Sequence, residues 1–562
     1  MPTSSSLRLV IIGGVAAGAS AAARARRLSE SAAITLIERG PDVSFANCGL
    51  PYFIGGEIAE RSALAVQTPQ TLKAMLNLDV RTGTEAVAID RASRCVLVRT
   101  LATGEEARLY YDKLILAPGA TPVRPPLPGV ADARIHTLRT LQDMDRIKAA
   151  AEGVSRVAVI GAGFIGLEMT EQLVRPGRSV TLIELENQVL PPLDRPMTAL
   201  LEDELRRRRV ELILGDGVQG FANSPSGIRV ILASGRAVEA ELVVLSIGVR
   251  PETSLARDAG LAVGPRGHIK VNGTMQTSDP NIYAAGDAIE TPDRITGEAC
   301  AVPLGGPANR QGRIAADHIF RGDKARPYPG SLGTAIVRVF DVAAGLTGWS
   351  EKRLRAAGKA YQAVTVGDNH HAGYFPGARP ITLRIVWSPD DGRVLGAQAT
   401  GFAGVDKRLD VIATAIARRL TIDDLCHLEL AYAPPYGSAK DLVNLAGFAA
   451  TNIRDGLVEI VDAIPEDADI QVVDARPPAL AQSHPLPRSG AGSVVNIPLG
   501  ELRRRHTELD RSRPVVTACA LGKTSYFAAR ILAQHGFRVR SFSGGIRGSI
   551  DPRTPVKPPP PK

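Results

Sequence analysis

Short runs of apolar residues recur along the chain, and several of them end at a glycine-rich turn. Residues 9–12 lead into Gly13, Gly14 and Gly18, a segment of small residues follows, and a second apolar run occupies residues 34–37. Continuous apolar runs of this length are typical of strands that are buried on both faces, and the small-residue segment between them favours a helix. The pattern predicts a strand, a turn, a helix and a second strand.

The same arrangement returns in the second quarter of the chain. Residues 157–160 lead into Gly161, Gly163 and Gly166, and the strand after the next helix occupies residues 180–183. In such turns the glycines let the backbone approach a pyrophosphate, which then sits on the N-terminus of the helix. One turn of this kind is a weak signal, but two complete units predict two dinucleotide sites.

Each unit also places a carboxylate at the end of its second strand. Glu38 and Glu184 hold these positions, which suit hydrogen bonds from the hydroxyls of an adenosine ribose. The first unit departs from the usual pattern, because Val15 stands where a second glycine is common. Two dinucleotide sites in one chain suggest a flavin and a nicotinamide that exchange a hydride.

The rest of the chain adds supporting segments and two further patterns. Gly119 and Gly248 each follow an apolar run, and Asp287 ends another run in a position that suits a ribitol hydroxyl. From about residue 327 the pattern changes to strands with one amphipathic helix at residues 405–420, as in an interface domain. A third unit of alternating strands and helices begins near residue 457.

Composition and charge narrow the classes of partner. The 562 residues predict three or four domains at about 150 residues each. The net charge is +9, but the arginine runs 206–209 and 503–505 lie in helix-like segments and are expected to be solvated faces. Aromatic residues make up only 4% of the chain and do not interleave with these runs, so no nucleic-acid partner is expected. No apolar window reaches the ~18 residues of a membrane span, so we expect a cytoplasmic protein with no membrane partner.

The five cysteines, an odd number, indicate a reducing compartment and not a disulfide framework. Three of them are expected to be structural: Cys95 in a strand, Cys300 in an irregular apolar stretch and Cys426 in a helix. There is no CxxC spacing, and the nine histidines form no ligand pattern, so we expect no metal site.

A fourth cysteine lies in the segment Ser-Phe-Ala-Asn-Cys-Gly-Leu-Pro-Tyr, which begins at Ser44, soon after Glu38. Gly49 and Pro51 suit the opening turn of a helix, which would put Cys48 at a helix N-terminus. The partial positive charge there is expected to lower the pKa of the thiol and favour the thiolate. A thiolate beside a flavin predicts a disulfide-reducing site. The alternative interpretation of Cys48 is a buried structural cysteine in a tight turn.

Taken together, these motifs resemble the pyridine nucleotide–disulfide oxidoreductases. Within that family they resemble the branch of coenzyme A-disulfide and NADH-dependent persulfide reductases that carries a C-terminal rhodanese domain. The resemblance covers about residues 8–548 and rests on the segments already described and on four further motifs, at residues 307–313, 371–378, 404–408 and 432–441.

The resemblance implies an α/β fold with two Rossmann-like dinucleotide-binding domains, an α+β dimerisation domain and a C-terminal rhodanese α/β domain. The domains are then expected at residues 1–150 and 271–326 for FAD, 151–270 for NAD, 327–452 for dimerisation and 453–550 for the rhodanese, with a disordered tail at 551–562. The nucleotide-binding residues would be Gly13, Gly14, Gly18, Glu38, Gly119 and Asp287 for FAD, and Gly161, Gly163, Gly166, Glu184 and Gly248 for NAD.

For the active site, the resemblance implies that Cys48 forms a mixed disulfide with the thiol of coenzyme A, flanked by Ser44 and Asn47. Phe53 stands where most disulfide reductases carry a second cysteine, which places the chain in the single-cysteine branch. Tyr374 and Tyr432 match tyrosines that enter the site from the other subunit, so a homodimer would be required. Candidates for binding the coenzyme A phosphates are Arg24, Arg27 and Lys73.

The third unit resembles a rhodanese through the loop that begins at Cys519, ends at Thr524 and precedes a helix expected at residues 525–534. Backbone N–H groups in such a loop point inward and can hold a persulfide anion on the cysteine. Thr524 stands where close relatives carry arginine, with Lys523 before it, which leaves the preferred sulfur donor open. Cys519 is expected to accept sulfane sulfur.

The expected enzyme uses NADH, with NADPH as the alternative, to reduce FAD and then a Cys48–coenzyme A disulfide. Its acceptor would be a small-molecule thiol compound: coenzyme A disulfide, its persulfide or a polysulfide. Glu184 and Glu186 would repel a 2′-phosphate, which favours NADH. Two alternatives remain: a flavin NADH oxidase or peroxidase, whose usual histidine is replaced here by Ala16, and a redox-sensing sulfur carrier with negligible turnover.

Overall fold

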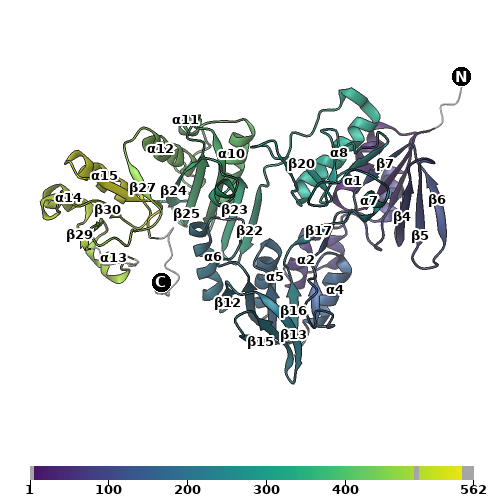
Figure 1. Cartoon of the computed structure of the whole chain (residues 1–562), viewed down its shortest axis with the longest axis horizontal. Helices are drawn as coiled ribbons and strands as arrows, with labels where there is room; N and C mark the ends of the chain where they lie inside the picture. Colours follow the sequence, from purple (N-terminus) through teal and green to yellow (C-terminus); the bar gives the residue numbers. More distant parts are fainter. Residues whose placement is uncertain (1–5, 487–492, 547–562) are drawn as a thin grey trace. The chain divides into compact units, whose positions relative to one another are not determined.

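A computed structural model describes residues 6–486 and 493–546 (Figure 1). The tail expected at residues 551–562 lies outside the described residues. The chain divides into two compact units, the first made of residues 1–185 and 216–333 and the second of residues 186–215 and 334–562. Among the described helices, none combines the length and the apolar character that crossing a bilayer requires.

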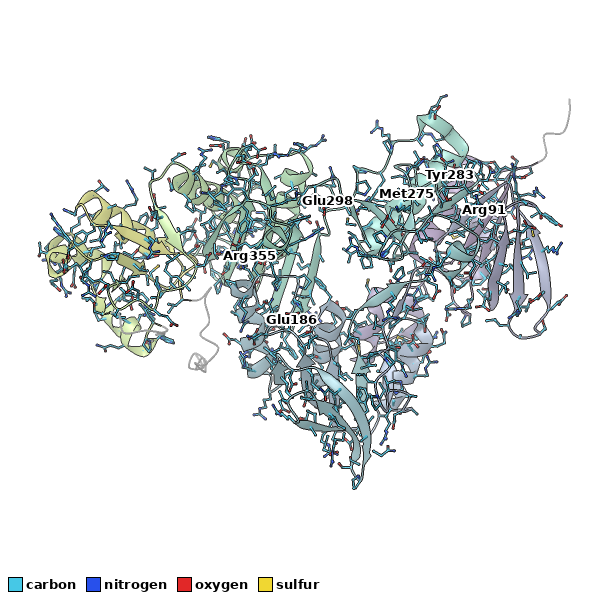
Figure 2. All side chains as sticks on the ribbon, in the orientation of Figure 1. Arg91, Glu186, Met275, Tyr283, Glu298 and Arg355 are labelled. Carbon is cyan, nitrogen blue, oxygen red and sulfur yellow. The ribbon has the colours of Figure 1, made fainter. Side chains whose placement is uncertain are left out.

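The first unit contains a parallel sheet with β1 (Arg8–Ile12) at its centre. The strand order is β19-β7-β1-β2-β3, with β2 at Ala33–Ile37, β3 at Asp79–Arg81, β7 at Lys113–Leu116 and β19 at Ile282–Ala284. Strands β1 and β7 are almost wholly apolar, because helices such as α1 (Ala16–Leu28) and α8 (Gly305–Arg321) pack against the sheet. Buried Met275 and Tyr283 belong to the same core (Figure 2).

A second parallel sheet in the first unit repeats this plan. Its strands follow the order β11-β10-β16-β9, with β10 at Arg156–Ile160, β11 at Ser179–Glu184, β16 at Leu242–Leu245 and β9 at Ile135–Thr137. Helix α5 (Phe164–Val174) connects β10 to β11. Each glycine turn therefore lies at the carboxyl end of a central strand, which is where parallel sheets bind ligands.

Smaller elements complete the first unit. The helices are α2 (Leu50–Ile54), α3 (Pro69–Leu76), α4 (Leu141–Ala150) and α7 (Ser254–Asp258). The remaining strands form small sheets: β4 (Thr84–Asp90), β5 (Cys95–Thr100) and β6 (Glu106–Tyr110); β13 (Val218–Ser224), β14 (Gly227–Leu232) and β15 (Ala237–Ala240); β8 (Ala120–Pro122) and β17 (Val249–Pro251); β18 (Ile269–Lys270), β20 (Ile289–Pro292) and β21 (Ala299–Cys300). The irregular stretch expected around Cys300 is therefore wrong, because Cys300 pairs with Thr291 in a short antiparallel ladder.

The second unit is built on an antiparallel sheet of order β22-β23-β26-β25-β24. These strands are β22 (Ala335–Val339), β23 (Val342–Gly348), β24 (Gln362–Asn369), β25 (Pro380–Trp387) and β26 (Val394–Gly401). The unit also contains β12 (Glu211–Leu214) and the helices α6 (Arg195–Arg207), α9 (Glu351–Ala356), α10 (Val405–Ala417), α11 (Ile422–His427) and α12 (Leu442–Arg454).

The expectation of one amphipathic helix in this region is wrong, since α9 and α12 accompany α10, while α11 is the helix that was expected around Cys426. Helix α12 escaped notice because it packs through small residues, Ala446, Gly447 and Ala450, which give little hydrophobic periodicity. Helix α10 also ends three residues before the expected boundary, where Arg419 adopts a positive φ of 59°.

The C-terminal part of the second unit is a five-stranded parallel sheet of order β27-β31-β30-β28-β29. Its strands are β27 (Glu459–Val461), β28 (Gln471–Asp474), β29 (Val494–Asn496), β30 (Val515–Ala518) and β31 (Val539–Phe542). Its helices are α13 (Pro478–Ser483), α14 (Leu499–Arg505) and α15 (Lys523–Gln534). Helix α15 begins two residues before the expected start, because Gly522 takes the left-handed conformation that caps it.

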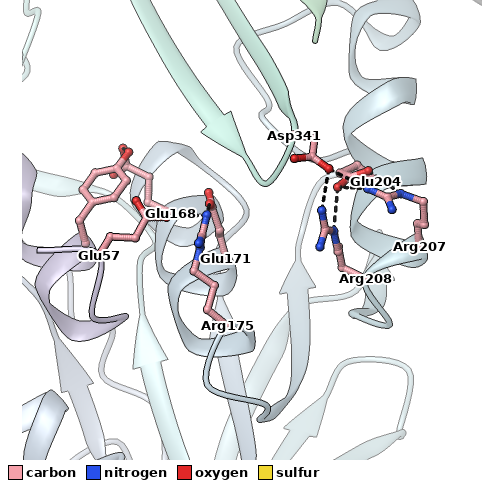
Figure 3. A network of polar contacts seen from close by, with 9 residues as sticks. Glu57, Glu168, Glu171, Arg175, Glu204, Arg207, Arg208 and Asp341 are labelled. Atoms are coloured by element: carbon pink, nitrogen blue, oxygen red, sulfur yellow. Dashed lines mark hydrogen bonds and ion pairs between the residues drawn. The ribbon is translucent and has the colours of Figure 1, made fainter.

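The arginine run at the end of α6 is exposed to solvent, as expected, and its side chains form ion pairs. Arg207 and Arg208 both contact Glu204, at 2.6 and 2.9 Å, and both reach Asp341 in the turn between β22 and β23, at 3.2 and 2.7 Å (Figure 3). These two arginines are therefore paired with carboxylates of the same unit, which agrees with the expectation that the run does not bind a polyanion.

Candidate functional site

Both glycine turns leave no room for a side chain where the following helix begins. A Cβ atom at Gly18 would lie 1.8 Å from the carbonyl oxygen of Gly13, and a Cβ at Gly166 would lie 1.8 Å from that of Gly161. Gly13 and Gly161 adopt positive φ angles of 97° and 96°, which an L side chain rarely allows. By contrast, the space beside Gly163 is open. This geometry fits a dinucleotide whose pyrophosphate approaches the backbone.

The two strand-end carboxylates reach back to their own turns. Glu38 accepts a hydrogen bond from the N–H of Gly14 at 2.8 Å, and Glu184 accepts one from the N–H of Ala162 at 2.6 Å. Each carboxylate is thus held at the edge of its turn, where an adenosine ribose would lie. The expected departure at Val15 does not disturb the first turn, since Val15 stands just outside α1 as its N-cap residue.

Asp287 lies near a residue that sequence reasoning missed. Burial raises the pKa of Asp287, and the positive charge of Arg139 opposes this rise. Burial also lowers the pKa of Arg139, which is attracted by Asp287 and Glu38. The Arg139 guanidinium would meet a Cβ at Gly119, and its bond to the Pro118 carbonyl is long, at 3.4 Å. A guanidinium in this setting fits the phosphates of FAD; no sequence motif marked it.

The structure brings Ser44, Asn47 and Cys48 together beside the first glycine turn. The N–H of Ser44 donates to the carbonyl of Gly14 at 2.8 Å, which ties the cysteine segment to the turn. Cys48 lies in a short 3₁₀ turn, Asn47–Gly49, directly before α2, with its sulfur 3.9 Å from the amide oxygen of Asn47. The thiol is exposed, as a redox residue requires.

The expectation that Cys48 has a lowered pKa is wrong for the protein chain itself. Desolvation by the surrounding protein raises the pKa of the thiol, and the negative charges of Glu168 and Asp287 raise it further. Helix α2 has only five residues, so its dipole offers little to offset these effects. The sulfur therefore lies near elements of both sheets, because Glu168 follows the second glycine turn while Asp287 lies in the turn after β19.

Glu168 is a second residue whose place the sequence did not reveal, although it ends the second turn motif. It accepts a hydrogen bond from the hydroxyl of Tyr52 at 3.1 Å, which connects α5 to α2. Arg175, at the end of α5, makes a second connection through its 2.5 Å contact to Glu57, just after α2, and its contact of 2.8 Å to Glu171 lies within α5 (Figure 3). The helix after the redox cysteine is therefore held against the helix of the second turn.

The three residues proposed for the coenzyme A phosphates have different surroundings. Arg24 contacts Asp317 on α8 at 2.6 Å, so a phosphate there would have to share or replace this partner. Arg27 is exposed, and Lys73 is exposed with its ammonium 2.8 Å from the amide oxygen of Asn77. Their role in binding stays a prediction.

In the second unit, the structure brings Tyr374 and Tyr432 together. Their hydroxyl oxygens lie 3.2 Å apart, and both side chains are exposed. Buried Arg408 fixes the two segments that carry them, because it donates to the His370 carbonyl at 2.8 Å and to the carboxylate of Asp441 at 2.7 Å. The unit therefore presents a pair of phenols on a rigid support.

Cys519 is buried at the end of β30, in contrast to Cys48. The N–H of Gly522 donates to its sulfur at 3.2 Å, as the expected inward-pointing loop requires. Lys523 is exposed, whereas Thr524 is partly covered.

The loop that begins at Cys519 rests on the antiparallel sheet of the same unit. A Cβ at Gly367 in β24 would lie 3.2 Å from the side chain of Leu521, and the N–H of Thr365 donates to the hydroxyl of Ser543 at 3.0 Å. Buried Arg384 in β25 reaches Asp462, after β27, at 3.1 Å. Strand β24 therefore forms one wall of the region around the buried cysteine.

All five cysteines are free thiols in this structure. Cys95 is buried in β5 and Cys426 is half-buried in α11, as expected for structural residues. Over residues 6–486 and 493–546, no group of three or more histidine, cysteine, aspartate or glutamate side chains is arranged to hold a metal ion.

Comparisons with known proteins agree with the geometry. The pyridine nucleotide-disulphide oxidoreductase model matches residues 7–301, its dimerisation domain matches residues 334–442, and a rhodanese-like domain matches residues 457–549. A coenzyme A disulfide reductase of Staphylococcus haemolyticus is 35% identical over 448 residues, which are 79% of this chain and all of the relative.

Solved structures cover almost the whole chain. The reduced CoADR-RHD of Bacillus anthracis is 44% identical, with a TM-score of 0.91 and 97% of both chains covered. A NAD-dependent persulfide reductase from A. fulgidus is 38% identical, with a TM-score of 0.91 over 97% of this chain and 100% of the other. The expected α/β fold, with its nucleotide-binding, dimerisation and rhodanese-like parts, is thereby confirmed.

As a prediction from the site itself, Glu168→Gln removes one of the negative charges that raise the pKa of Cys48. The pKa should fall, and more of the thiol should ionise at pH 7. In the cofactor-free protein we expect alkylation of Cys48 by iodoacetamide to become about threefold faster, measured on its peptide by mass spectrometry.

Glu57→Gln is the matched control, since it removes a carboxylate that is paired with Arg175 and should leave the alkylation rate unchanged. An unchanged or slower reaction in Glu168→Gln would show that this carboxylate does not act on the thiol.

Proposed function

This chain belongs to the pyridine nucleotide-disulphide oxidoreductase family, and we propose that it reduces coenzyme A disulfide or coenzyme A persulfide with NAD(P)H. The observation that carries the proposal is the lone redox cysteine. Cys48 is exposed beside the first glycine turn, while Phe53 fills the place of a second cysteine and packs under Lys148, whose ammonium lies 3.7 Å from the ring centre. With no resolving cysteine in α2, the second thiol must come from the substrate.

The two glycine turns provide the sites for FAD and NAD(P)H. Gly13, Gly18, Glu38, Asp287 and Arg139 would hold FAD, and the turn that begins at Gly161 and ends with Glu184 would hold the nicotinamide dinucleotide. When bound, FAD supplies hydride chemistry between the nicotinamide and a disulfide. The protein positions these groups and the sulfur of Cys48.

Cys48 performs the exchange with the substrate. Its thiolate attacks coenzyme A disulfide, forms a Cys48–coenzyme A disulfide and releases one coenzyme A thiolate. With coenzyme A persulfide, attack on the inner sulfur forms the same mixed disulfide and releases hydrosulfide. Two electrons from NAD(P)H then return the mixed disulfide to two thiolates, and protons from solvent complete the coenzyme A product.

The rhodanese-like part supports a sulfane-sulfur substrate over a plain disulfide. The sulfur of Cys519 accepts a hydrogen bond from the N–H of Gly522, the residue that precedes α15, and a persulfide can be stabilised there. Within one chain, a sulfurtransferase that produces a persulfide raises the local concentration of substrate for the reductase. The free state of all five cysteines supports a reducing, cytoplasmic setting.

We expect Cys48→Ser to abolish turnover with coenzyme A persulfide, because the serine hydroxyl cannot form the mixed disulfide. It should also remove the long-wavelength absorbance of a thiolate beside the flavin, and a coenzyme A mass adduct on the Cys48 peptide. Cys426→Ser, which changes a half-buried cysteine in α11, is the matched control and should keep all three.

Two outcomes would contradict this function. Rapid oxygen or peroxide consumption without any thiol substrate would identify an NADH oxidase or peroxidase. A water-forming NADH oxidase from Lactobacillus brevis is 27% identical to this chain, with a TM-score of 0.77 over 80% of this chain and 99% of the other. Steady-state NADH consumption that is slow and unchanged in Cys48→Ser would identify a sensor or sulfur carrier.

We also propose that NADH is preferred over NADPH. The carboxylate of Glu184 is buried at the edge of the second turn, and a 2′-phosphate there would meet its negative charge. We expect kcat/KM to be at least about tenfold higher with NADH, and Glu184→Gln to narrow the difference. A clear preference of the wild-type enzyme for NADPH would contradict this assignment.

A homodimer is the proposed assembly, with Tyr374 and Tyr432 acting on Cys48 of the other subunit. The match to a dimerisation domain at residues 334–442 supports a dimer, and so do the exposed aromatic side chains of this region, which include Phe375 and Tyr436. Paired phenols can donate hydrogen bonds to a departing thiolate.

A mixed dimer tests the shared site. One subunit carries Cys48→Ser, and the other carries Tyr374→Phe with Tyr432→Phe. If the tyrosines act across the interface, one intact site forms and turnover should recover to about half of the wild-type value. Turnover as low as in the two parent homodimers would show that each subunit uses its own tyrosines.

A further inference from the structure

We propose that Ser525 is a catalytic residue of the Cys519 site, with a hydroxyl that accepts a hydrogen bond from the thiol and donates one to the thiolate. Ser541 is proposed as a positioning residue that holds this hydroxyl. The inference rests on the sulfurtransferase role proposed for Cys519 and names the group that stabilises its ionised sulfur.

The geometry places both serines in one buried line with the sulfur. Ser525 lies in the first turn of α15 and is fully buried, with its oxygen 3.4 Å from the sulfur of Cys519. The oxygen of Ser541, on β31 and also buried, lies 3.3 Å from the oxygen of Ser525. Thr517 on β30 fixes the backbone of Ser525, because its hydroxyl donates to the Ser525 carbonyl at 2.8 Å.

The hydroxyl of Ser525 has two possible acceptors for its one proton. Besides the sulfur, it reaches the carbonyl oxygen of Gly522 at 2.9 Å. A hydroxyl has one donor and two acceptor positions. When Cys519 is a thiol, Ser525 can therefore accept from the S–H and from Ser541 while it donates to Gly522, and every group is satisfied.

Ionisation of Cys519 reverses only one of these bonds. The Ser525 hydroxyl turns its proton from the Gly522 carbonyl to the thiolate. That carbonyl does not become unsatisfied, because it also accepts the N–H of Tyr526 at 3.1 Å, the first hydrogen bond of α15. The thiolate then has two donors, the hydroxyl of Ser525 and the N–H of Gly522. A buried ion without hydrogen-bond donors is costly. Rotation of the Ser525 hydroxyl supplies one donor and therefore favours the Cys519 thiolate.

Ser541 holds the Ser525 hydroxyl in position in both the thiol and the thiolate forms of Cys519. Its hydroxyl can donate to the oxygen of Ser525 whether Cys519 is a thiol or a thiolate. A hydroxyl that accepts a hydrogen bond becomes a better donor, so Ser541 strengthens the bond from Ser525 to the sulfur. It contributes only through Ser525, because the described contacts place no bond between Ser541 and the sulfur.

Both half-reactions use the Cys519 thiolate. In the first, it attacks the terminal sulfur of a persulfide donor, which moves with its proton to Cys519, while the donor's other sulfur leaves as a thiolate. In the second, an acceptor thiolate attacks the outer sulfur of the Cys519 persulfide, and the Cys519 thiolate leaves. Neither step needs an oxidant or a reductant. Ser525 stabilises the nucleophile of the first step and the leaving group of the second.

Few charged groups lie where they could stabilise or destabilise the Cys519 thiolate in place of Ser525. On the loop itself Lys523 is exposed, and on β31 Arg540 lies next to Ser541 in the sequence. At the end of the neighbouring strand β28, Asp474 and Arg476 form a buried ion pair at 2.6 Å and offset each other. The facing strand β24 brings Gly367 and Thr365, which carry no charge. The polar groups within bonding distance of the sulfur, the N–H of Gly522 and the hydroxyl of Ser525, are therefore neutral.

The test compares Ser525→Ala, Ser525→Thr and Ser541→Ala with the full-length wild type. One measurement is the rate at which iodoacetamide alkylates Cys519 at pH 7 and at pH 9.5, followed on its peptide. The other is single-turnover discharge of the Cys519 persulfide, loaded with glutathione persulfide, to coenzyme A. Ser483→Ala, which removes an exposed hydroxyl from α13 of the same domain, is the matched control.

We expect Ser525→Ala to slow discharge and alkylation at pH 7 by about tenfold or more, with alkylation restored at pH 9.5. Ser541→Ala should have a smaller effect in the same direction, and Ser525→Thr should recover most of the rate. If the substitution only disturbed packing, the reactivity of Cys519 would fall at both pH values or would rise. A defect at pH 7 that disappears at pH 9.5 therefore indicates loss of the hydrogen bond.

The proposal is overturned if Ser525→Ala matches the wild type in alkylation at pH 7, or if its deficit persists at pH 9.5. Wild-type protein that never acquires a persulfide on Cys519 would instead refute the sulfurtransferase function, and the alkylation measurement would still decide the role of Ser525. Reduction of coenzyme A disulfide through Cys48 should be unchanged in every variant, which confirms an intact fold.

Discussion

The contact between each glycine turn and its own helix is the constraint on which the redox half of the molecule depends. At Gly18 and Gly166 the helix backbone lies so close to the turn that a Cβ atom would overlap a carbonyl oxygen. The helix is therefore fixed against the strand end, and its free N–H groups would be available to a nucleotide bound there. The N–H of Ser44 donates to the carbonyl of Gly14, so the same turn also positions the segment that carries Cys48.

The two reactive sulfur atoms are handled by opposite physical means. Desolvation by the surrounding protein and then the charges of Glu168 and Asp287 raise the pKa of Cys48, so its thiolate must be favoured by the groups that bind beside it. Cys519 is buried, and the groups that bond to its sulfur are neutral: the N–H of Gly522 in the loop and the hydroxyl of Ser525 at the start of α15. The first arrangement depends on its ligands for reactivity, whereas the second is complete within the fold.

The antiparallel sheet of the second unit supports more than an interface. Through Gly367 and Thr365, strand β24 contacts the Cys519 loop and the segment after β31. The same strand leads into the segment that holds Tyr374, which buried Arg408 and Asp441 fix. One sheet thus supports both the pair of tyrosine hydroxyls and the loop that begins at Cys519, so the rhodanese-like part packs on the sheet and is not merely linked to it by the chain.

The sequence by itself determined the two glycine turns, their carboxylates, the lone cysteine at position 48 and the rhodanese-type loop, because each is a local pattern whose chemistry depends on spacing along the chain. Only the tertiary structure revealed Arg139, Glu168 and Ser525, and only it reversed the expected pKa of Cys48. It also exposed the missed helix α12, whose small residues hide their periodicity. These features depend on charges and contacts between residues far apart in the chain, and desolvation exists only once the chain has folded around a group.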